Sequence, residues 1–159
     1  FYTLDVKDLP GGRGHGEPIR LMIDLGNDQT ASAAFLYKGE RRFLVASTAG
    51  YGFIVREEDC LSSTRKGKQV LNVGDGAEAC VCRPVEGDLV ASVGENKKFL
   101  VFDLSEMPEM TRGKGVVIQK FHDGGLSDAK TFSKKEGLTW VDRSGRVQTI
   151  DDWKSYAGK

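Results

Sequence analysis

The sequence predicts an all-β, propeller-like fold made of four-stranded blades, and three observations lead to this prediction. Short runs rich in Val, Phe, Leu and Thr are separated by turns that draw on 20 glycines. Long windows show no helical periodicity, and only the tail around residues 151–154 is expected to form a helical turn. The strand-like runs also repeat with a period of about 50 residues, which suits one propeller blade.

Each predicted repeat contains four strand-like segments in a fixed order. First strands are expected at 42–47, 88–92 and 137–141, and second strands at 52–55, 98–102 and 145–149, with 1–4 in the same position of an earlier repeat. Third strands are expected at 19–23, 69–73 and 116–119, and fourth strands at 32–36, 78–82 and 127–132. One such sheet cannot bury both faces, so the repeats are expected to stack radially. We therefore predict a single, partial domain over residues 1–159, with blades near 1–37 (partial), 38–85, 86–134 and 135–159 (partial).

The composition is that of a globular protein and narrows the possible functions. Lysine and arginine total 23, aspartate and glutamate total 23, and the net charge is zero. This balance argues against a uniformly polybasic nucleic-acid binder, but it allows a basic stripe because a partner responds to the local field. The sequence contains no run of about 18 apolar residues, so it predicts no membrane-spanning helix. Phe1 lies inside a strand-like run, so we expect the chain to be cut from a longer polypeptide.

The three cysteines, Cys60, Cys80 and Cys82, follow no metal-binding or disulfide pattern. Their number is odd, they form no CxxC motif, and neither His15 nor His122 stands at ligand spacing from them. We expect small packing residues in a reducing cytoplasm, and no metal.

A basic, glycine-rich loop recurs between the second and third strands, at residues 12–16, 64–68 and 111–115. Glycines let the backbone approach a phosphate, while Lys and Arg neutralise its charge and release counterions, so binding is salt-sensitive and independent of sequence. In a radial array these loops fall along one curved edge, which favours bent DNA. The predicted DNA-binding residues come from the loops and from nearby strand ends: Arg13, His15, Arg65, Lys66, Lys68, Arg112, Lys114, Arg41, Arg42, Lys97 and Lys98.

Other interpretations of these features are weaker. A single loop of this kind is usually an ordinary turn with solvated charges, and the threefold repetition is what favours DNA. The loops lack the Gly-Lys-Ser/Thr ending of a nucleotide-binding loop. A propeller that binds other proteins is the alternative function, although the Gly-His and Trp-Asp signatures of such propellers are absent. His122 beside Asp123 has no accompanying nucleophile motif, so no catalytic residue is predicted.

Two further groups of residues receive structural predictions. Trp140 and Phe99 lie in strand-like runs and are expected in the core. Residues 57–59 form an acidic cluster near a basic loop. They are expected either to sit away from the DNA path or to tune the strength of binding.

Several segments resemble a known family of domains. Residues 4–10, followed by the Arg-Gly cluster and Pro18, are similar to the repeat of the C-terminal domain shared by gyrase A and topoisomerase IV A subunits. Residues 109–116 are similar to the same repeat, and the likeness covers essentially the whole chain. The segments at 12–19 and 124–128 look closest to the topoisomerase IV branch.

The resemblance implies a β-pinwheel, a propeller-like fold of five or six blades whose basic outer edge binds and bends duplex DNA. It implies that the catalytic tyrosine and the ATP and Mg²⁺ sites lie outside this chain, so no cofactor and no catalytic tyrosine are assigned here. The implied partners are duplex DNA, the ATPase B subunit, and the rest of the A subunit, at the nucleoid in the bacterial cytoplasm. The gyrase branch carries a Gln-Arg-Arg-Gly-Gly-Lys-Gly box. Residues 111–115 lack its leading Gln and one Arg, which favours topoisomerase IV-type decatenation and relaxation over supercoiling.

Overall fold

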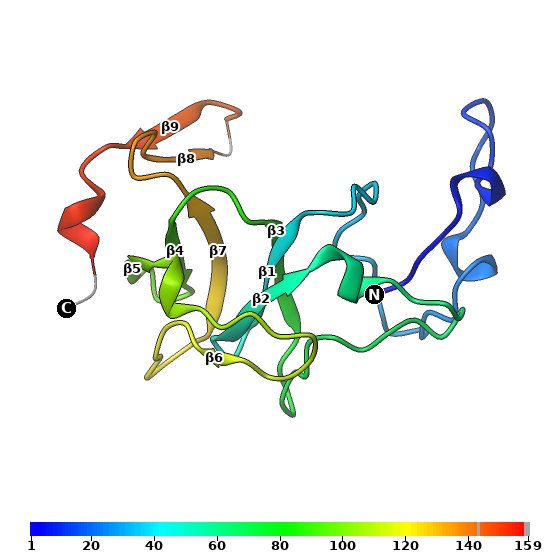
Figure 1. Cartoon of the computed structure of the whole chain (residues 1–159), viewed down its shortest axis with the longest axis horizontal. Helices are drawn as coiled ribbons and strands as arrows, with labels where there is room; N and C mark the ends of the chain where they lie inside the picture. The colour runs from blue at the N-terminus through cyan, green and yellow to red at the C-terminus, as the bar shows by residue number, and fades with distance from the viewer. Residues whose placement is uncertain (143, 158–159) are drawn as a thin grey trace.

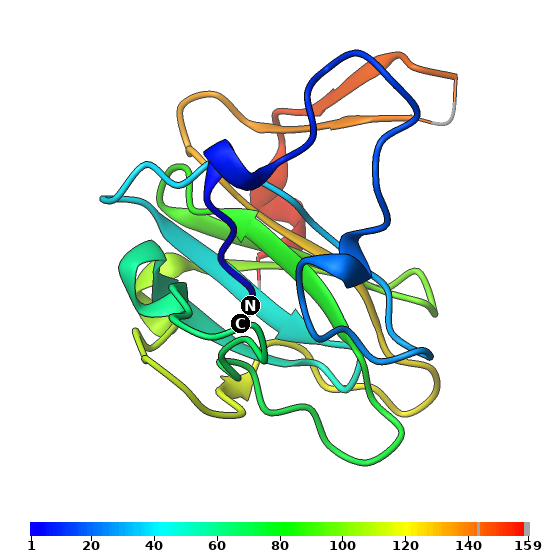
Figure 2. The ribbon, with the colours of Figure 1, turned by 90° about the vertical axis from the view of Figure 1, so that its right-hand side faces the viewer.

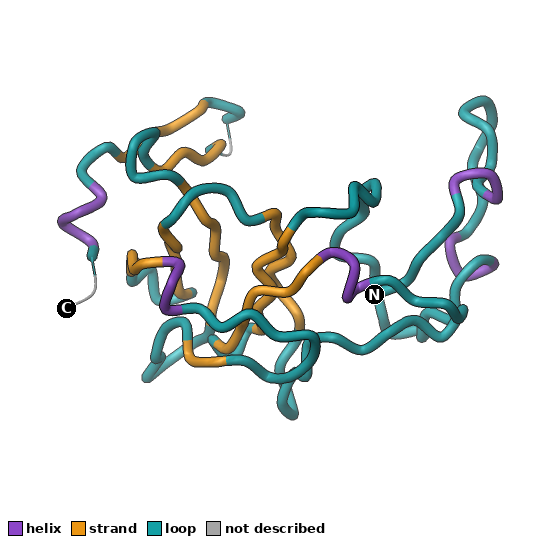
Figure 3. Tube along the Cα trace, viewed as in Figure 1, coloured by secondary structure: helices purple, strands orange, loops and turns teal. Residues whose placement is uncertain are grey.

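The computed structural model describes residues 1–142 and 144–157, and in this part of the chain the fold is nearly all β. Nine strands form three antiparallel sheets, and the helical segments are 3₁₀ turns of three or four residues. Figure 1 shows the sheets side by side, with the segment before the first strand extending to one side. That segment is mostly loop (Figure 3). The predicted all-β class is confirmed.

The first sheet is built around β1 (Arg42–Ser47). Its strand order is β3-β1-β2-β6, with β2 at Tyr51–Arg56, β3 at Ala79–Pro84 and β6 at Val116–Val117. Every residue of β1 after Arg42 is buried, because the strand is central and both of its faces are covered. In the chain, β6 comes after β4 and β5, which belong to the second sheet. The first sheet is therefore completed by residues of the following repeat.

The second sheet has three strands. Its order is β5-β4-β7, with β4 at Leu89–Gly94, β5 at Phe99–Asp103 and β7 at Leu126–Phe132. A separate hairpin pairs β8 (Leu138–Val141) with β9 (Val147–Ile150). Figure 2 shows strands of the two larger sheets running in a common diagonal direction, and β7 contacts both β1 and β3. The two sheets therefore pack face to face in a nearly aligned arrangement.

Apolar side chains cover both faces of the first sheet. Leu44 and Ala46 of β1 enter the cluster between the two sheets, together with Val90 of β4. Phe43 and Val45 enter the cluster on the opposite face. Successive residues of β1 thus serve opposite clusters, as the alternation of side chains along a strand requires.

One pairing arrangement occurs twice, and each time a strand edge receives a segment from the next repeat. The N-terminal amine of Phe1 donates to Lys68 O at 2.8 Å, and Lys68 N–H donates to Phe1 O at 2.7 Å. One repeat later, Gly52 is the antiparallel partner of Val116 across β2 and β6. Phe1 and Gly52 therefore occupy equivalent positions, as do Lys68 and Val116.

In both arrangements a glycine directly precedes the residue, Lys68 or Val116, that pairs with the strand edge. Gly67 has φ +75° and Gly115 has φ +82°, which is the left-handed region that favours glycine. A Cβ on Gly67 would lie 2.7 Å from Phe1 O, and one on Gly115 would lie 2.1 Å from Gly52 O. The incoming backbone thus passes so close to the neighbouring carbonyl oxygen that the Cβ of any residue other than glycine would collide with it.

The segment before β1 does not contain the strands predicted at residues 1–4, 19–23 and 32–36. It forms 3₁₀ turns at Val6–Asp8 (η1) and Ile19–Leu21 (η2), and the rest is loop. The local sequence is strand-like, but this segment holds no first strand to which the others can pair. The strand prediction is therefore wrong here.

The predicted third strands are also shorter than expected. Of residues 69–73, only Leu71 forms a bridge, with Gly113, and β6 keeps two of the four residues expected at 116–119. Each segment pairs with the strand edge of the preceding repeat instead of joining the sheet of its own repeat. Only one or two residues of each segment take part in this pairing, so a long strand does not form. The tail does form a 3₁₀ turn, η5 (Trp153–Tyr156).

The predicted core position of Trp140 is wrong, because its side chain is 44% exposed. It lies in β8, and the two-stranded sheet of β8 and β9 is too small to bury an indole. Phe99 is half-buried, and its ring meets that of Tyr156 edge-on with centroids 5.1 Å apart.

All three cysteines are free thiols beside apolar neighbours. Cys60 is buried in the cluster that contains Phe43, while Cys80 and Cys82 border the clusters on the two faces of the first sheet. Burial raises the pKa of each thiol to about 11. The thiols are therefore protonated at neutral pH, which fits the predicted packing role.

Candidate nucleic-acid interface

Two of the three basic loops occupy equivalent places in the fold. Lys66 directly precedes Gly67, and Lys114 directly precedes Gly115, where each segment reaches the edge of the preceding repeat. The left-handed glycine and the crossing that follows it fix the position of the lysine backbone. Both lysines are exposed. The fold therefore repeats a lysine at the same edge of two consecutive repeats.

The arginines of these two loops are engaged within the chain. Arg65 Nη2 donates to Leu21 O at 2.7 Å, and its Nε lies 3.7 Å from the Asp24 carboxylate. Arg112 Nη2 donates to Gln69 Oε1 at 3.2 Å. Arg65 thus ties its loop to the segment before β1, and Arg112 ties its loop to the loop of the preceding repeat. Both arginines shape the edge as well as adding charge to it.

The lysines of the loops are less constrained. Lys114 Nζ lies 3.9 Å from the centroid of the Tyr51 ring, a cation–π contact across the repeat boundary. Lys66 and Lys68 are exposed, and neither forms an ion pair with any residue that the structure describes. Their charges are available to a partner. Tyr51 was missed by sequence reasoning, because only the folded chain brings it under Lys114.

Arg41 points into the fold. It forms an ion pair with Glu57, whose side chain is 1% exposed and which also accepts hydrogen bonds from the N–H groups of Lys38 at 3.1 Å and Gly39 at 2.9 Å. The hydrogen bond from Arg41 lowers the pKa of Glu57, and the carboxylate raises the pKa of Arg41 in turn. This pair anchors the chain where β1 begins. Glu57 is thereby separated from the rest of its acidic cluster and has a structural role.

Arg42 shares a carboxylate with a neighbouring arginine. Arg42 Nη1 lies 3.7 Å from Glu109, to which Arg56 Nε donates at 2.7 Å. The hydrogen bond from Arg56 lowers the pKa of Glu109. Glu58 adds a second partner to Arg56, at 3.5 Å. Two arginines and two carboxylates make this group neutral, so it adds little to the field at a distance.

The first basic loop stands apart from the other two. Arg13 and His15 are exposed, and no hydrogen bond joins residues 10–17 to another segment within the described ranges. A Cβ on Gly12 or Gly14 would meet nothing within 4 Å. The structure therefore does not bring this loop together with the equivalent pair.

Lys97 and Lys98 lie in the exposed turn between β4 and β5. Lys97 has φ +64°, and Lys98 N–H donates to Asn96 Oδ1 at 3.0 Å. Gln119 Nε2 donates to Lys98 O at 3.3 Å, which places the turn beside the segment that follows β6. Lys120 is exposed on that segment, and sequence reasoning missed it. Its sequence position carries no basic neighbours, and its closeness to the turn arises only on folding.

Within residues 1–142 and 144–157, no group of three or more His, Cys, Asp or Glu side chains could hold a metal ion. No helix in the same ranges is long and apolar enough to cross a membrane. The two equivalent loops therefore present exposed lysines, Lys66 and Lys114, beside glycine turns.

The full chain aligns with proteins that are named as the A subunit of DNA topoisomerase 4. It is 43% identical to that of Caulobacter vibrioides and 40% identical to that of Rickettsia conorii, and each alignment covers all of this chain and 21% of the relative. The chain thus spans about a fifth of the length of these curated relatives. No family model matches it.

Solved structures match the fold. The Escherichia coli ParC C-terminal domain gives a TM-score of 0.85 over 99% of this chain and 68% of that one, at 24% identity. A DNA gyrase A C-terminal domain gives a TM-score of 0.56 over 77% of this chain and 42% of that one, at 16% identity. The fold is that of the β-pinwheel domains of type IIA topoisomerase A subunits. With the sequence match along its whole length, the chain belongs to the family of C-terminal domains of topoisomerase IV A subunits.

Proposed function

We propose that this domain binds duplex DNA without sequence preference and bends it along the edge that carries the repeated lysines. The observation that supports this most directly is the equivalence of Lys66 and Lys114, each exposed and each beside a glycine that crosses a strand edge. Lysines at repeated positions can contact phosphates at separate points along one duplex. In the radial stacking that we expect of the repeats, a duplex that follows both positions is bent.

The charges of the domain suit this function although the chain is neutral as a whole. Glu57 is paired with Arg41, and Glu109 is shared by the arginines of the first sheet. These carboxylates are therefore neutralised within the fold. Lys66 and Lys68 have no ion-pair partner among the described residues. Their positive charges are therefore free to attract the phosphates of a duplex.

The basic residues divide by role in this proposal. Exposed lysines of the equivalent loops make the central phosphate contacts, and the charge-neutral pairs of Arg41 and Arg42 support the fold. Arg65 and Arg112 hold the shape of the loops. The outer contacts come from side chains at the free loop, at the β4–β5 turn and after β6: Arg13, His15, Lys97, Lys98 and Lys120.

Salt-dependent titration of a random-sequence duplex tests the proposal. Each phosphate contact that is lost should flatten the slope of log affinity against log salt by about 0.9. The Lys66→Ala/Lys114→Ala variant should therefore flatten it by about 1.8. The control, Lys135→Ala/Lys154→Ala, removes the same charge from exposed positions outside the loops. Equal slopes for the two double variants would overturn the assigned site, and an unmodified domain that fails to bind at low salt would overturn DNA binding.

We further propose that the domain acts within a topoisomerase IV A subunit, where it presents DNA to a catalytic core outside this chain. The alignment with proteins of that name supports this. ATP and Mg²⁺ would act elsewhere in the enzyme, DNA and the B subunit would be partners, and the site of action would be the bacterial nucleoid. In the intact enzyme, Lys66→Ala/Lys114→Ala should slow decatenation of linked circles and leave DNA-independent ATP hydrolysis unchanged. Unchanged decatenation would contradict this role.

A further inference from the structure

The β1–β2, β4–β5 and β8–β9 hairpins close through the same kind of turn. In each turn the N–H of the fourth residue donates to the carbonyl of the first: Gly50 to Ser47 at 2.9 Å, Lys97 to Gly94 at 2.9 Å, and Gly145 to Asp142 at 3.0 Å. The φ of the fourth residue is +81°, +64° and +80° in chain order. A left-handed residue at the end of a three-residue hairpin loop is usually glycine. Two of these hairpins have glycine there, and the β4–β5 hairpin has Lys97.

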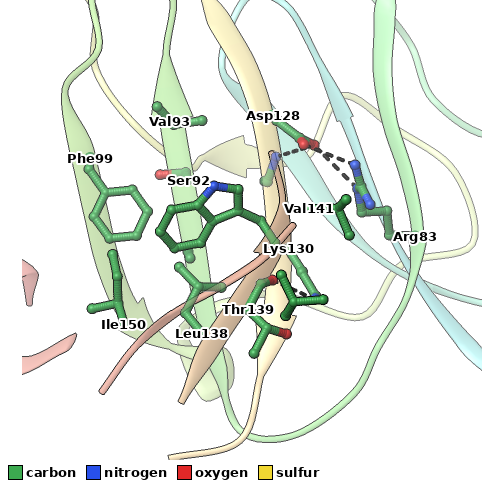
Figure 4. A pocket seen from close by; sticks show the side chains of 14 residues that line it. Arg83, Ser92, Val93, Phe99, Asp128, Lys130, Leu138, Thr139, Val141 and Ile150 are labelled. Carbon is green, nitrogen blue, oxygen red and sulfur yellow. Dashed lines mark hydrogen bonds and ion pairs between the residues drawn. The ribbon is translucent and has the colours of Figure 1, made fainter. Parts of the chain in front are cut away.

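Lys97 is strained in this position. The turn joins β4 to β5 beyond the pair of Val93 with Phe99, which Figure 4 shows. A side chain with a Cβ is disfavoured in the left-handed region, and lysine is not among the residues enriched there. Among residues 1–142 and 144–157, Lys97 is the one non-glycine residue with a positive φ. Such strain persists where the surrounding structure fixes the backbone, and it gathers at sites that have a function.

Hydrogen bonds from the segment that follows β6 hold this turn on two sides. Gln119 Nε2 donates to Lys98 O at 3.3 Å, and Gln119 Oε1 accepts the Ser92 hydroxyl at 3.0 Å. Glu95 N–H donates to Gly125 O at 2.9 Å, and Gly125 N–H donates back to Glu95 Oε2 at 3.0 Å. The backbone on either side of the strained residue is therefore fixed by contacts outside the turn itself.

The Phe121 ring, on the same segment, packs between two hairpin turns. Its Cε2 would lie 2.9 Å from a Cβ on Gly50 of the β1–β2 turn. Its Cδ1, on the opposite edge of the ring, would lie 3.0 Å from a Cβ on Gly94 of the β4–β5 turn. Contacts this close leave neither turn room to shift. They also place Lys120, the residue before Phe121, beside the β4–β5 turn.

Three exposed lysines gather around this packed ring: Lys97, Lys98 and Lys120. None of them forms an ion pair with a residue in the described ranges. Two carboxylates belong to the same part of the chain. That of Glu95 accepts the Gly125 N–H, and Asp123 is exposed on the segment after Phe121. The lysines outnumber the carboxylates, and a lysine without an ion-pair partner is suited to contact a DNA phosphate.

We propose that the β4–β5 turn is a phosphate-binding point separate from the glycine loops, and that Lys97 keeps its strained backbone because its ammonium group contacts the duplex. The proposal rests on the DNA-binding function proposed above, and it adds an exchange of stability for binding at one residue. A glycine at this position would relax the turn, as in the other two hairpins, and would remove the contact. Lys98 and Lys120 add positive charge beside it.

The Lys97→Gly variant tests the proposal, because it should improve the fold and impair binding at once. Its melting temperature should rise by about 2–4 °C as the strain is released. Its slope of log affinity against log salt, for a random-sequence duplex, should flatten by about 0.9. Lys135→Ala removes an exposed charge elsewhere and should leave the slope unchanged. A Lys97→Gly domain with the slope of the unmodified domain would overturn the turn as a binding point. The effect of Lys66→Ala/Lys114→Ala would then still decide the proposed edge by itself.

Three further variants separate strain, charge and position. Lys97→Ala removes the charge and keeps a left-handed Cβ, so it should flatten the slope without raising the melting temperature. Gly145→Lys creates the same strain in the β8–β9 turn, where a Cβ meets nothing within 4 Å, and should lower the melting temperature by about 2–4 °C. An unchanged melting temperature there and in Lys97→Gly would overturn the strain. The triple variant Lys66→Ala/Lys97→Gly/Lys114→Ala should flatten the slope by about 2.7, because separate phosphates are lost. A triple variant no flatter than the double variant would overturn the separate binding point.

Discussion

Lys114 Nζ lies 3.9 Å from the centroid of the Tyr51 ring, and this contact joins a loop of one repeat to the sheet of the repeat before it. The backbone at the same boundary is joined by the pairing of Tyr51 with Val117. The lysine is thus held at the edge by its ammonium group while remaining exposed. The contact couples the geometry of the proposed DNA edge to the boundary between repeats.

A double-mutant cycle between Tyr51→Leu and Lys114→Met should reveal this coupling. The expected interaction free energy is about 0.5–1 kcal/mol, the usual strength of an exposed cation–π contact. Urea unfolding of the four proteins measures it. The matching cycle between Tyr51→Leu and Lys66→Met should give no interaction, because Lys66 belongs to the other loop. Equal values in the two cycles would show that the Lys114 contact is not specific.

Removing Arg41 should destabilise the fold strongly. Arg41→Ala leaves the buried carboxylate of Glu57 without its charged partner, which typically costs about 3–5 kcal/mol of unfolding free energy. Replacing both residues with methionine should recover much of that loss. Arg42→Ala is the control and should cost no more than about 1 kcal/mol, because its ion pair is exposed. If Arg41→Ala kept its stability and instead flattened the salt dependence of DNA binding, Arg41 would be a DNA contact.

Gly115→Ala should destabilise the domain and weaken DNA binding together. The left-handed backbone alone costs a residue with a Cβ about 1–3 kcal/mol, and the methyl group would also lie 2.1 Å from Gly52 O. Gly12→Ala is a matched control, since a Cβ there meets nothing within 4 Å. Thermal unfolding and duplex titration measure the two effects. A stable Gly115→Ala domain that binds DNA normally would contradict the close crossing.

Asp142 should titrate near pH 2 in the folded domain. The Ser144 hydroxyl, the Gln148 amide and the N–H groups of Arg146 and Ser144 all donate to its carboxylate and lower its pKa to about 2. The folded pKa lies below the unfolded value, so this group stabilises the fold above about pH 4 and loses that contribution as the pH falls towards about 2. Carboxyl NMR titration measures the pKa directly.

Ser144→Ala provides the control for that titration. It removes the hydroxyl that contributes most to the shift, so the pKa of Asp142 should move back towards its ordinary value. Ser155→Ala, which removes the hydroxyl partner of Asp152, should leave the Asp142 titration unchanged. An unshifted Asp142 in the unmodified domain would show that the turn before β9 is not held by this carboxylate.

The strands that pair within one repeat were predictable from the sequence. β1 occupies the predicted residues 42–47, and the predicted strands at 88–92 and 127–132 appear as β4 and β7. Alternating apolar residues and glycine turns are local signals. The exchange of β6 into the preceding sheet was not predictable, because the partner of Val116 is set by packing between distant segments.

The segment before β1 also shows that local sequence does not determine which segments pair. Residues 32–36 have the pattern of β3, yet they form no strand because no central strand lies beside them. The candidate site behaves similarly. The basic residues were visible in the sequence, but the sequence could not show that Arg41 would pair with Glu57 or that Lys114 would rest on Tyr51.

The exchange of β6 also dictates an order of events during synthesis. The ribosome releases the residues of β1, β2 and β3 first, but the sheet that they form lacks its last strand until Val116 and Val117 emerge, after all of β4 and β5. The first sheet is therefore completed only after part of the next repeat has been synthesised. Until then, the outer backbone groups of β2 are open to pairing with other nascent chains.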